Sequence, residues 1–567
     1  MQEDTTLSKA WVNIKGEVVA GGPVRKIYSS HGSNWLKCTD REKAVLKKFG
    51  HLIPVRPFAD IILIKYGQPA LENQCIESIK KHTDLTRHIL TDVDNKLIDK
   101  NLGALWNDLI SASDAPYVCL LNSDTIVEPE WLDKLIEAVE NTGADAVGPM
   151  TNKCGIAYQV GEKTEVDKLR DAPQLSGFCV LIRKESWKKA GGFPEFFPFY
   201  GQESDLMDRL KKKVVCKSVF IQHLGGGTIK NTEGRSQEKE KELSLEVYKR
   251  VRQFDWNHKL LILGSGRDNR FPLWRGVDQA CDEFNHRGGD ARHIPVEQIQ
   301  DEETLAELSE WRPETTLVIC TNPTRLINSG PNIKRLPGFK GLWHNDLRPV
   351  KFEYQALYGI FHGLFMCWRK PGGEYNLDNW SMKFGTPVYY MPQGSVINPY
   401  LKQTEEKFRA LFIGGTGDDK YHNDRAGLFK AINATVINEV GRSQRIKIED
   451  QSSRLYRAAR YSYAVSPAVT GYNSLRLYNI LAYGGCTFVR HFNGVDELFC
   501  DHEHLFVFKD DKQANGLMAE LDGNPKYRER VARNGWRLQQ AKHTVLWRIM
   551  NMIHNLREDK SFWGYGK

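Results

Sequence analysis

Apolar and polar positions along this chain follow a pattern that predicts strands separated by helices. The runs Ile61–Ile64 and Tyr117–Asn122 have the length and composition of buried strands, and Arg87–Leu90 is expected to be a further strand. Between them, Leu71–Lys81 and Ala104–Ser113 show helical spacing. Because strands that alternate with helices favour a largely parallel, doubly wound sheet, we predict an α/β fold.

The same alternation restarts after a charged, periodic helix at Gly234–Arg250, which is expected to join two domains. A strand at Lys259–Leu263 runs into the turn Gly264-Ser265-Gly266, and a helix follows at Gly276–Asn285. The last amphipathic helices, between Tyr527 and His554, are expected to return across two lobes. Further apolar runs in this half lie at Thr316–Cys320, Gly359–Cys367, Pro387–Tyr390 and Ala410–Gly414.

Chain length predicts more than one domain. At 567 residues the chain exceeds the roughly 250 to 300 residues at which a single core stops growing. We predict an N-terminal extension at 1–57, a first domain at 58–250, and two further lobes at 258–395 and 396–560. The first domain is expected to contain one Rossmann-like sheet, and each later lobe another.

Composition narrows the class of protein. No stretch approaches the ~20 apolar residues of a membrane span, and the N-terminus lacks the regions of a secretory signal. We therefore expect a cytoplasmic protein, for which contact with a membrane is limited to peripheral binding. Eleven cysteines without a CxxC pair argue against a disulfide framework and a structural zinc site.

Charge and glycine motifs argue against several other functions. The net charge of +8 is small for this length and its residues are interleaved, which disfavours a nucleic-acid partner. The turn Gly264-Ser265-Gly266 lacks the third glycine of the dinucleotide fingerprint, and Gly415–Lys420 does not complete a P-loop. Neither an NAD enzyme nor an NTPase is supported.

Asp124 follows the buried strand Tyr117–Asn122, at the edge where a parallel sheet binds its ligands. A carboxylate there can hold Mg²⁺ or Mn²⁺, which commonly bridges protein carboxylates to substrate phosphates and would neutralise a departing diphosphate. A lone aspartate at a strand end is more often a helix cap, so the surrounding motifs decide between the two interpretations.

Those motifs occur in a consistent order between about residues 58 and 230, and in that order they resemble the family 2 glycosyltransferases, a GT-A group that makes polysaccharides and decorates glycoconjugates. The resemblance implies a UDP-, GDP- or dTDP-sugar donor, a glycan or glycoconjugate acceptor, and inversion at the anomeric carbon. The residues that carry it are the strand from Asp60 with Tyr66, Asn101-Leu102-Gly103 with Asn107, Leu121–Thr125, Pro129–Leu132, Leu175–Phe178, Ala190–Phe193, Gln202–Leu206 with Arg209, and His223.

The resemblance also implies roles for individual residues in the donor site. Tyr66 and Asp92 would contact the base and ribose, and Asn101 lies in a donor-binding motif. Asp124 would bind the divalent metal. Asn122, also expected at the donor, stands where the family's DxD-like motif has its first acid. His223 would be a further ligand of the metal or diphosphate, or else a structural residue at a strand end.

The resemblance places the catalytic base at Glu203, where a carboxylate could take the proton from an acceptor hydroxyl. Asp205 is the alternative base. The structural interpretation is that both acids only cap the helix that carries Arg209.

The C-terminal half resembles the GT-B glycosyltransferases, within them the spore-protein-like group whose C-terminal lobe is of family 1 or 4 type. Gly414 and Gly415 would allow close approach to a diphosphate, and Arg425 or Arg476 could pair with its charge. Asn479 stands where that family often has a glutamate for the ribose. The motifs are Phe412–Gly415, Arg425, Asn473–Gly485, Gly494–Phe499, Phe506–Lys509, His543-Thr544 and Arg548.

In the lobe that precedes them, His344 or Asp346 could act as a base, or the two could form a satisfied polar cluster. We therefore predict a bifunctional glycosyltransferase, metal-dependent in its GT-A half and with no cofactor expected in its GT-B half. Two alternatives stay open. Only the GT-A half is catalytic and the GT-B half binds acceptor, or the chain is a viral-type DNA-base glycosyltransferase.

Overall fold

The computed structural model describes two compact units. The first comprises the described residues up to Glu195 and from Tyr200 to Glu242, and the second comprises Phe196–Pro198 and the described residues from Leu243 onward. The expected extension at 1–57 lies outside the described residues, as do Gly415 and Asp346. The structure describes residues 58–98, 100–166, 168–198, 200–225, 237–264, 272–319, 323–344, 359–367, 381, 385–398, 406–414, 425–437, 455–464, 475–492 and 494–558.

The first unit is built on one mixed sheet with the strand order β2-β1-β3-β7-β5-β8-β4, with β6 paired to β8. Strand β1 lies parallel to β2 and β3, as predicted, and β5 lies parallel to β8. The strands are β1 (Ala59–Lys65), β2 (Ile89–Asp94), β3 (Tyr117–Asn122), β4 (Thr125–Ile126), β5 (Ala146–Thr151), β6 (Leu169–Asp171), β7 (Cys179–Arg183) and β8 (Lys213–His223).

Strand β7 departs from the largely parallel sheet that the sequence predicts, because it runs antiparallel to both β3 and β5. A parallel pair needs a crossover connection, usually a helix. Among the described residues between β5 and β7, only a short 3-10 turn at Ala157–Gln159 and strand β6 occur, so the chain returns in the opposite direction.

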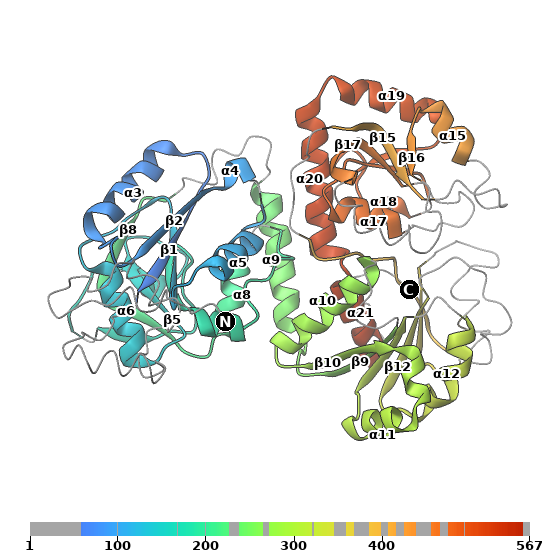
Figure 1. Cartoon of the computed structure of the whole chain (residues 1–567), viewed down its shortest axis with the longest axis horizontal. Helices are drawn as coiled ribbons and strands as arrows, with labels where there is room; N and C mark the ends of the chain where they lie inside the picture. The colour runs from blue at the N-terminus through green and yellow to red at the C-terminus, as the bar shows by residue number, and fades with distance from the viewer. Residues whose placement is uncertain are drawn as a thin grey trace, which may run out of the picture. The chain divides into compact units, whose positions relative to one another are not determined.

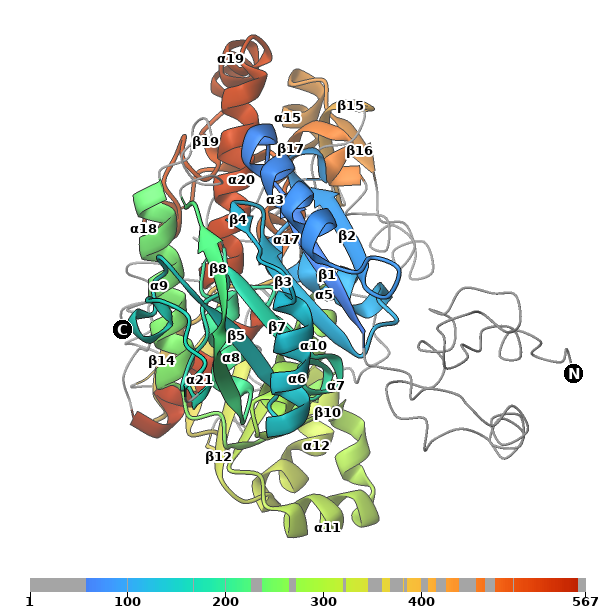
Figure 2. The same ribbon diagram turned by 90° about the vertical axis from the view of Figure 1, so that its left-hand side faces the viewer.

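Helices cover both faces of this sheet. Apolar residues of α3 and α6 share one core with one face, and those of α5, α7 and α8 share a second core with the other. Figure 2 shows α3 and α6 together on the side of the strands that faces the viewer. The helices are α3 (Pro69–His82), α4 (Asn95–Ile98), α5 (Leu102–Ala112), α6 (Trp131–Thr142), α7 (Lys184–Lys189) and α8 (Gln202–Arg209).

The second unit contains two entirely parallel sheets, as expected for two Rossmann-like lobes (Figure 1). The first has the order β10-β9-β11-β12-β13-β14 and the second β16-β15-β17-β18-β19. Their strands are β9 (Lys259–Gly264), β10 (Asp290–Pro295), β11 (Thr315–Ile319), β12 (Phe339–His344), β13 (Gly363–Met366), β14 (Val388–Tyr390), β15 (Phe408–Ile413), β16 (Thr435–Ile437), β17 (Ala459–Ala464), β18 (Thr487–Arg490) and β19 (Phe506–Phe508).

The C-terminal helix of this unit returns to the first lobe, where its apolar face shares a core with α10 and the six-stranded sheet. None of the described helices of the chain is long and apolar enough to cross a bilayer. The helices are α9 (Gln237–Gln253), α10 (Pro272–His286), α11 (Glu302–Trp311), α12 (Pro323–Arg335), α15 (Arg425–Ala431), α17 (Leu475–Ala482), α18 (Val495–Leu498), α19 (Asp511–Asp522), α20 (Pro525–Lys542) and α21 (Val545–Glu558), with a 3-10 turn at Val296–Gln300.

A buried arginine fixes the segment between the lobes. Arg548 donates from Nε to the carbonyl oxygens of Pro392 and Gln393, at 2.8 and 3.0 Å, and from Nη2 to His543 Nδ1 at 2.7 Å. Because a guanidinium can only donate, His543 Nδ1 must accept, so His543 is neutral here.

Candidate functional site

Asp124 and His223 meet at the edge of the first sheet. Strand β4 begins directly after Asp124 and pairs with the end of β8, so that Thr125 lies opposite His223. This register brings His223 Nε2 to 3.3 Å from Asp124 Oδ1, and Asp124 is only 5% exposed. The structure therefore brings together the two residues that the sequence assigns to the metal.

The orientation of His223 is set by the turn after β5. His223 Nδ1 lies 2.9 Å from the carbonyl oxygen of Lys153, and the side chain of Asn152 bonds both the N–H and the carbonyl of His223. The imidazole also stacks on Phe178, with ring centroids 5.3 Å apart. Since a carbonyl only accepts, Nδ1 carries a proton and Nε2 is directed at Asp124.

The environment of His223 favours a positive charge at this point. Burial opposes protonation, but the hydrogen bonds to Asp124 and to the Lys153 carbonyl outweigh it, so the pKa of His223 is raised. A neutral imidazole would face the Asp124 carboxylate with its own lone pair, so a proton or a cation between them relieves the repulsion.

This donor set fits a divalent cation that is shared with a phosphate. Mg²⁺ is usually held in proteins by one or two carboxylates, with substrate phosphates and water completing its shell. In the part of the chain that the structure describes, no three His, Cys, Asp or Glu side chains converge on one point. Asp124 and His223 would supply two ligands to such a cation. Asn122 ends β3 with an exposed side chain, and its N–H donates to the Phe178 carbonyl at 2.8 Å.

Glu203 lies in the first turn of α8, half-buried. Burial raises the pKa of its carboxyl group, which brings the group closer to the range of a useful general base. A Cβ at Gly177 would lie 2.9 Å from Glu203 Cγ, so glycine is needed there for Glu203 to keep its place.

Asp205, the alternative base, is occupied by Arg209. Arg209 Nε and Nη2 donate to Asp205 Oδ2 at 3.2 and 2.9 Å, and both side chains are buried. The same guanidinium donates to the carbonyl oxygens of Ala190 and Gly192. Asp205 therefore holds a buried cation that ties α8 to the turn after α7, which favours Glu203 as the base.

The residues expected at the nucleotide lie on neighbouring elements. Tyr66 follows β1 and its N–H donates to Glu72 Oε1 at 2.9 Å. Asp92, on β2, forms an ion pair with Lys65 at 2.5 Å, and this contact raises the pKa of Lys65. Asn101 caps α5 by accepting from the N–H of Ala104 at 3.2 Å, so the structure gives that oxygen a local role.

In the second unit, Gly414 and Arg476 meet at the end of β15. Arg476 Nε donates to the carbonyl of Ile413 at 2.6 Å, and a Cβ at Gly414 would overlap Arg476 Nη2. Gly414 has φ of +144°, a conformation that favours glycine. Arg476 and Arg425 both approach the ring of Phe412, at 4.4 and 5.7 Å from its centroid. Their charges make this turn suitable for an anion.

Two further candidate residues of the second unit, Asn479 and His344, are hydrogen-bonded within the protein or buried. Asn479 Oδ1 accepts from Ser395 Oγ at 2.6 Å, so the amide is engaged by the segment between the lobes. His344 ends β12 and is 2% exposed. Asp346, named with His344 as a possible base, and Gly415, which follows Gly414, lie outside the described residues.

Sequence reasoning missed Lys153, which orients His223 through its backbone carbonyl, and Gln202, which precedes Glu203. Any residue can offer a backbone carbonyl, so the sequence contains nothing that would identify Lys153. Gln202 stood within the quoted motif, where its amide next to the proposed base could have been noticed.

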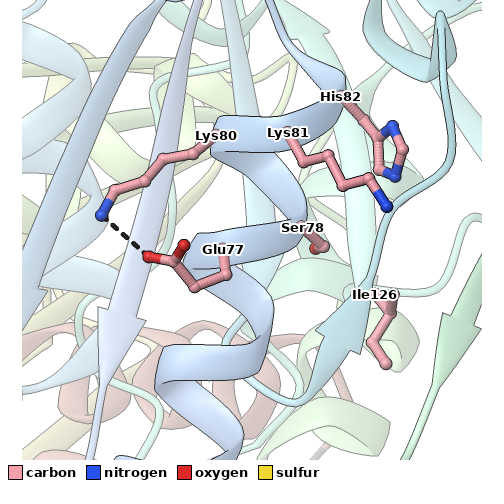
Figure 3. Close-up of a pocket in the computed structure, with 6 residues that line it drawn as sticks. All are labelled: Glu77, Ser78, Lys80, Lys81, His82 and Ile126. Carbon is pink, nitrogen blue, oxygen red and sulfur yellow. Dashed lines mark hydrogen bonds and ion pairs between the residues drawn. The ribbon is translucent and has the colours of Figure 1, made fainter.

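A surface hollow of about 560 Å³ lies at the C-terminal end of α3, where Figure 3 shows Lys80 directed at Glu77. These two side chains form an ion pair at 3.0 Å. None of the sequence-predicted site residues lines the hollow, although Ile126, which does, is two positions beyond Asp124.

Comparison with protein families places two regions of the chain. Residues 77–190 match the model of Glycosyl transferase family 2, and residues 404–554 match a model described as Glycosyl transferase-like. The first region contains Asp124 but ends before Glu203 and His223, and the second contains Gly414 and Arg476.

A search of curated proteins finds no match. Among solved structures, one similar chain is an alpha-glucosyltransferase in complex with UDP-glucose and DNA containing an abasic site. It is 8% identical, with 53% of this chain and 99% of that chain covered and a TM-score of 0.39. A likeness of that strength carries no argument about donor or acceptor.

Proposed function

We propose that this chain carries out two sugar transfers from nucleotide-sugar donors to a glycan or glycoconjugate. The proposal rests on the two matched regions, a glycosyltransferase family 2 domain and a second, glycosyl transferase-like domain. The chain is an enzyme that transfers sugars, and the proposal concerns how each half does so. The observation that carries the metal-dependent transfer is the convergence of Asp124 and His223 at the edge of the family 2 sheet.

In the first unit, Asp124 and His223 would hold Mn²⁺ or Mg²⁺, which when bound neutralises the charge of the departing diphosphate. Tyr66, directly after β1, and Asp92, on β2, orient the nucleoside, and Asn122 ends the neighbouring strand β3 two residues before Asp124. Ile64 pairs with Asn122 across the sheet, which supports a continuous donor site along this edge.

Glu203 accepts the proton of an acceptor hydroxyl as that oxygen attacks the anomeric carbon of the donor sugar. The bond from that carbon to the diphosphate oxygen breaks with its electron pair leaving on the nucleotide. Attack from the face opposite the leaving group inverts the anomeric configuration. The raised pKa of Glu203 supports this role, because a base works best with a pKa near the operating pH.

In the second unit, the Gly414 turn with Arg476 and Arg425 binds the diphosphate of another donor without a metal. One observation favours a second candidate function for this unit. The hydrogen bond between Ser395 and Asn479 occupies the amide expected at the ribose, so the unit could bind acceptor rather than donor.

The test is transfer by the intact chain from a panel of UDP-, GDP- and dTDP-sugars, with Mn²⁺ and with EDTA. The proposal expects one donor whose transfer EDTA abolishes and another whose transfer survives EDTA. A single EDTA-sensitive activity would reduce the second unit to a binding module, and transfer from no donor would contradict the proposal.

A further inference from the structure

Gln202 is a buried amide of the first unit. It is the first residue of α8 and is 1% exposed. Within the residues that the structure describes, neither its Nε2 nor its Oε1 has a partner. Both ends of one side chain are thus buried and unsatisfied.

A buried amide of this kind makes the folded state less stable, so folding by itself does not explain it. Nearly all buried polar groups in proteins are paired, and an unpaired one lowers stability. Gln159, in the same unit, shows the ordinary case. It is 0% exposed, its Nε2 donates to the Pro149 carbonyl at 3.0 Å, and its Oε1 accepts from the Ser176 N–H at 2.8 Å. The contrast points to a functional reason for Gln202, since conflicts with stability collect at functional sites.

The surroundings of Gln202 place it beside the proposed base. Glu203 is the next residue in the first turn of α8. A Cβ at Gly103 would lie 2.5 Å from the Pro194 carbonyl, so glycine is needed there, and 3.4 Å from Gln202 Cγ, so the Gln202 side chain lies beside the start of α5. Of the residues proposed for the nucleotide, Tyr66 instead follows β1 and Asp92 lies on β2.

We propose that Gln202 recognises the acceptor sugar by binding two adjacent hydroxyl groups. A primary amide offers an oxygen that accepts and an NH₂ group that donates. Each hydroxyl of a vicinal diol can do either, so the pair satisfies both ends of the amide. The inference rests on the proposed function, because it assigns the acceptor to the side of Glu203. Acceptor binding has to uncover the side chain, and the hydrogen bonds formed then offset that opening.

The experiment compares Gln202→Met with Gln159→Met in the full chain. Calorimetry resolves separate unfolding transitions. The unfolding temperature of the first unit is expected to rise by about 2 to 4 °C for Gln202→Met, since this variant removes an unpaired amide, and to fall for Gln159→Met. In transfer assays, Gln202→Met is expected to raise the acceptor KM at least tenfold, while calorimetric titration gives an unchanged Kd for the nucleoside diphosphate of the donor that the wild-type chain uses. Gln202→Leu provides a second apolar variant.

A fall in unfolding temperature for both Gln202 variants, or an unchanged acceptor KM in chains that still transfer sugar, overturns the inference and leaves the proposed function intact. A wild-type chain that transfers to no acceptor contradicts the proposed function itself, and the inference falls with it.

Discussion

His223 Nε2 lies 3.3 Å from Asp124 Oδ1, and this distance is set by strand pairing. Thr125 pairs with His223 across β4 and β8, and the N–H of Leu224 donates to the Asp124 carbonyl at 2.9 Å, so the backbone holds both residues in place. A preorganised pair of this kind would need little rearrangement to receive the proposed cation and a phosphate bound to it.

Replacing Glu203 by Gln removes the proposed base without changing its size. We expect kcat to fall by about 10² to 10⁴-fold, the usual contribution of general base catalysis. Because burial raises the pKa of Glu203 and only the ionised form accepts a proton, wild-type kcat should fall as pH drops through that raised pKa. The variant should lack this acid limb in a pH–rate profile, and an unchanged kcat would exclude Glu203 as the base.

Asp205→Ala is expected to act on stability. It leaves the buried guanidinium of Arg209 without its carboxylate, a loss of about 3 to 5 kcal/mol in the free energy of unfolding. Urea unfolding of the full chain checks this. A variant of normal stability that has lost transfer would instead identify Asp205 as the base.

Gly414→Ala is expected to weaken nucleotide binding in the second unit. The added Cβ overlaps Arg476 Nη2 and φ of +144° is unfavourable for alanine, so the guanidinium must move. Calorimetric titration with nucleoside diphosphates in EDTA should show about a tenfold or greater loss of affinity, as for a lost charge-assisted contact. Gly427→Ala, in helix α15 with open space around it, is the matched control and should bind normally. Equal affinities would contradict the anion site.

The second unit should lose stability in mild acid. Burial, with the charge of Arg548 beside it, holds the pKa of His543 well below its ordinary value of 6.5. The unfolded chain therefore takes up a proton near pH 6.5 that the folded chain refuses, so stability is fully present above that pH and declines below it. Thermal unfolding between pH 5 and 8 should show this decline, weaker in His543→Gln; a midpoint independent of pH would contradict it.

Much of the fold could be predicted from the alternation of apolar runs, but edges and directions could not. The strand predicted at Arg87–Leu90 occurs at Ile89–Asp94, because β2 is an edge strand whose residues are only partly buried and whose sequence includes Asp92 and Asp94. The antiparallel direction of β7 left no trace in its apolar run, since burial of both faces looks the same in either direction.

Asp124 and Glu203 could be proposed as site residues from the sequence because each lies in a short contiguous motif. The support around them could not. Lys153 acts through a backbone carbonyl, and only the packing reveals that the Gln202 amide has no hydrogen-bond partner among the described residues. Arg209 follows Asp205 by four residues on one helix, and this helical spacing does predict that the two side chains pair.

The central claim, two independent transfer sites, is tested most directly by assaying Asp124→Asn and Arg476→Ala against the donor panel with and without Mn²⁺. We predict that Asp124→Asn lowers the metal-dependent transfer by about 10²- to 10³-fold, and that Arg476→Ala lowers only the transfer that survives EDTA. Metal-dependent transfer that persists in Asp124→Asn would contradict the account.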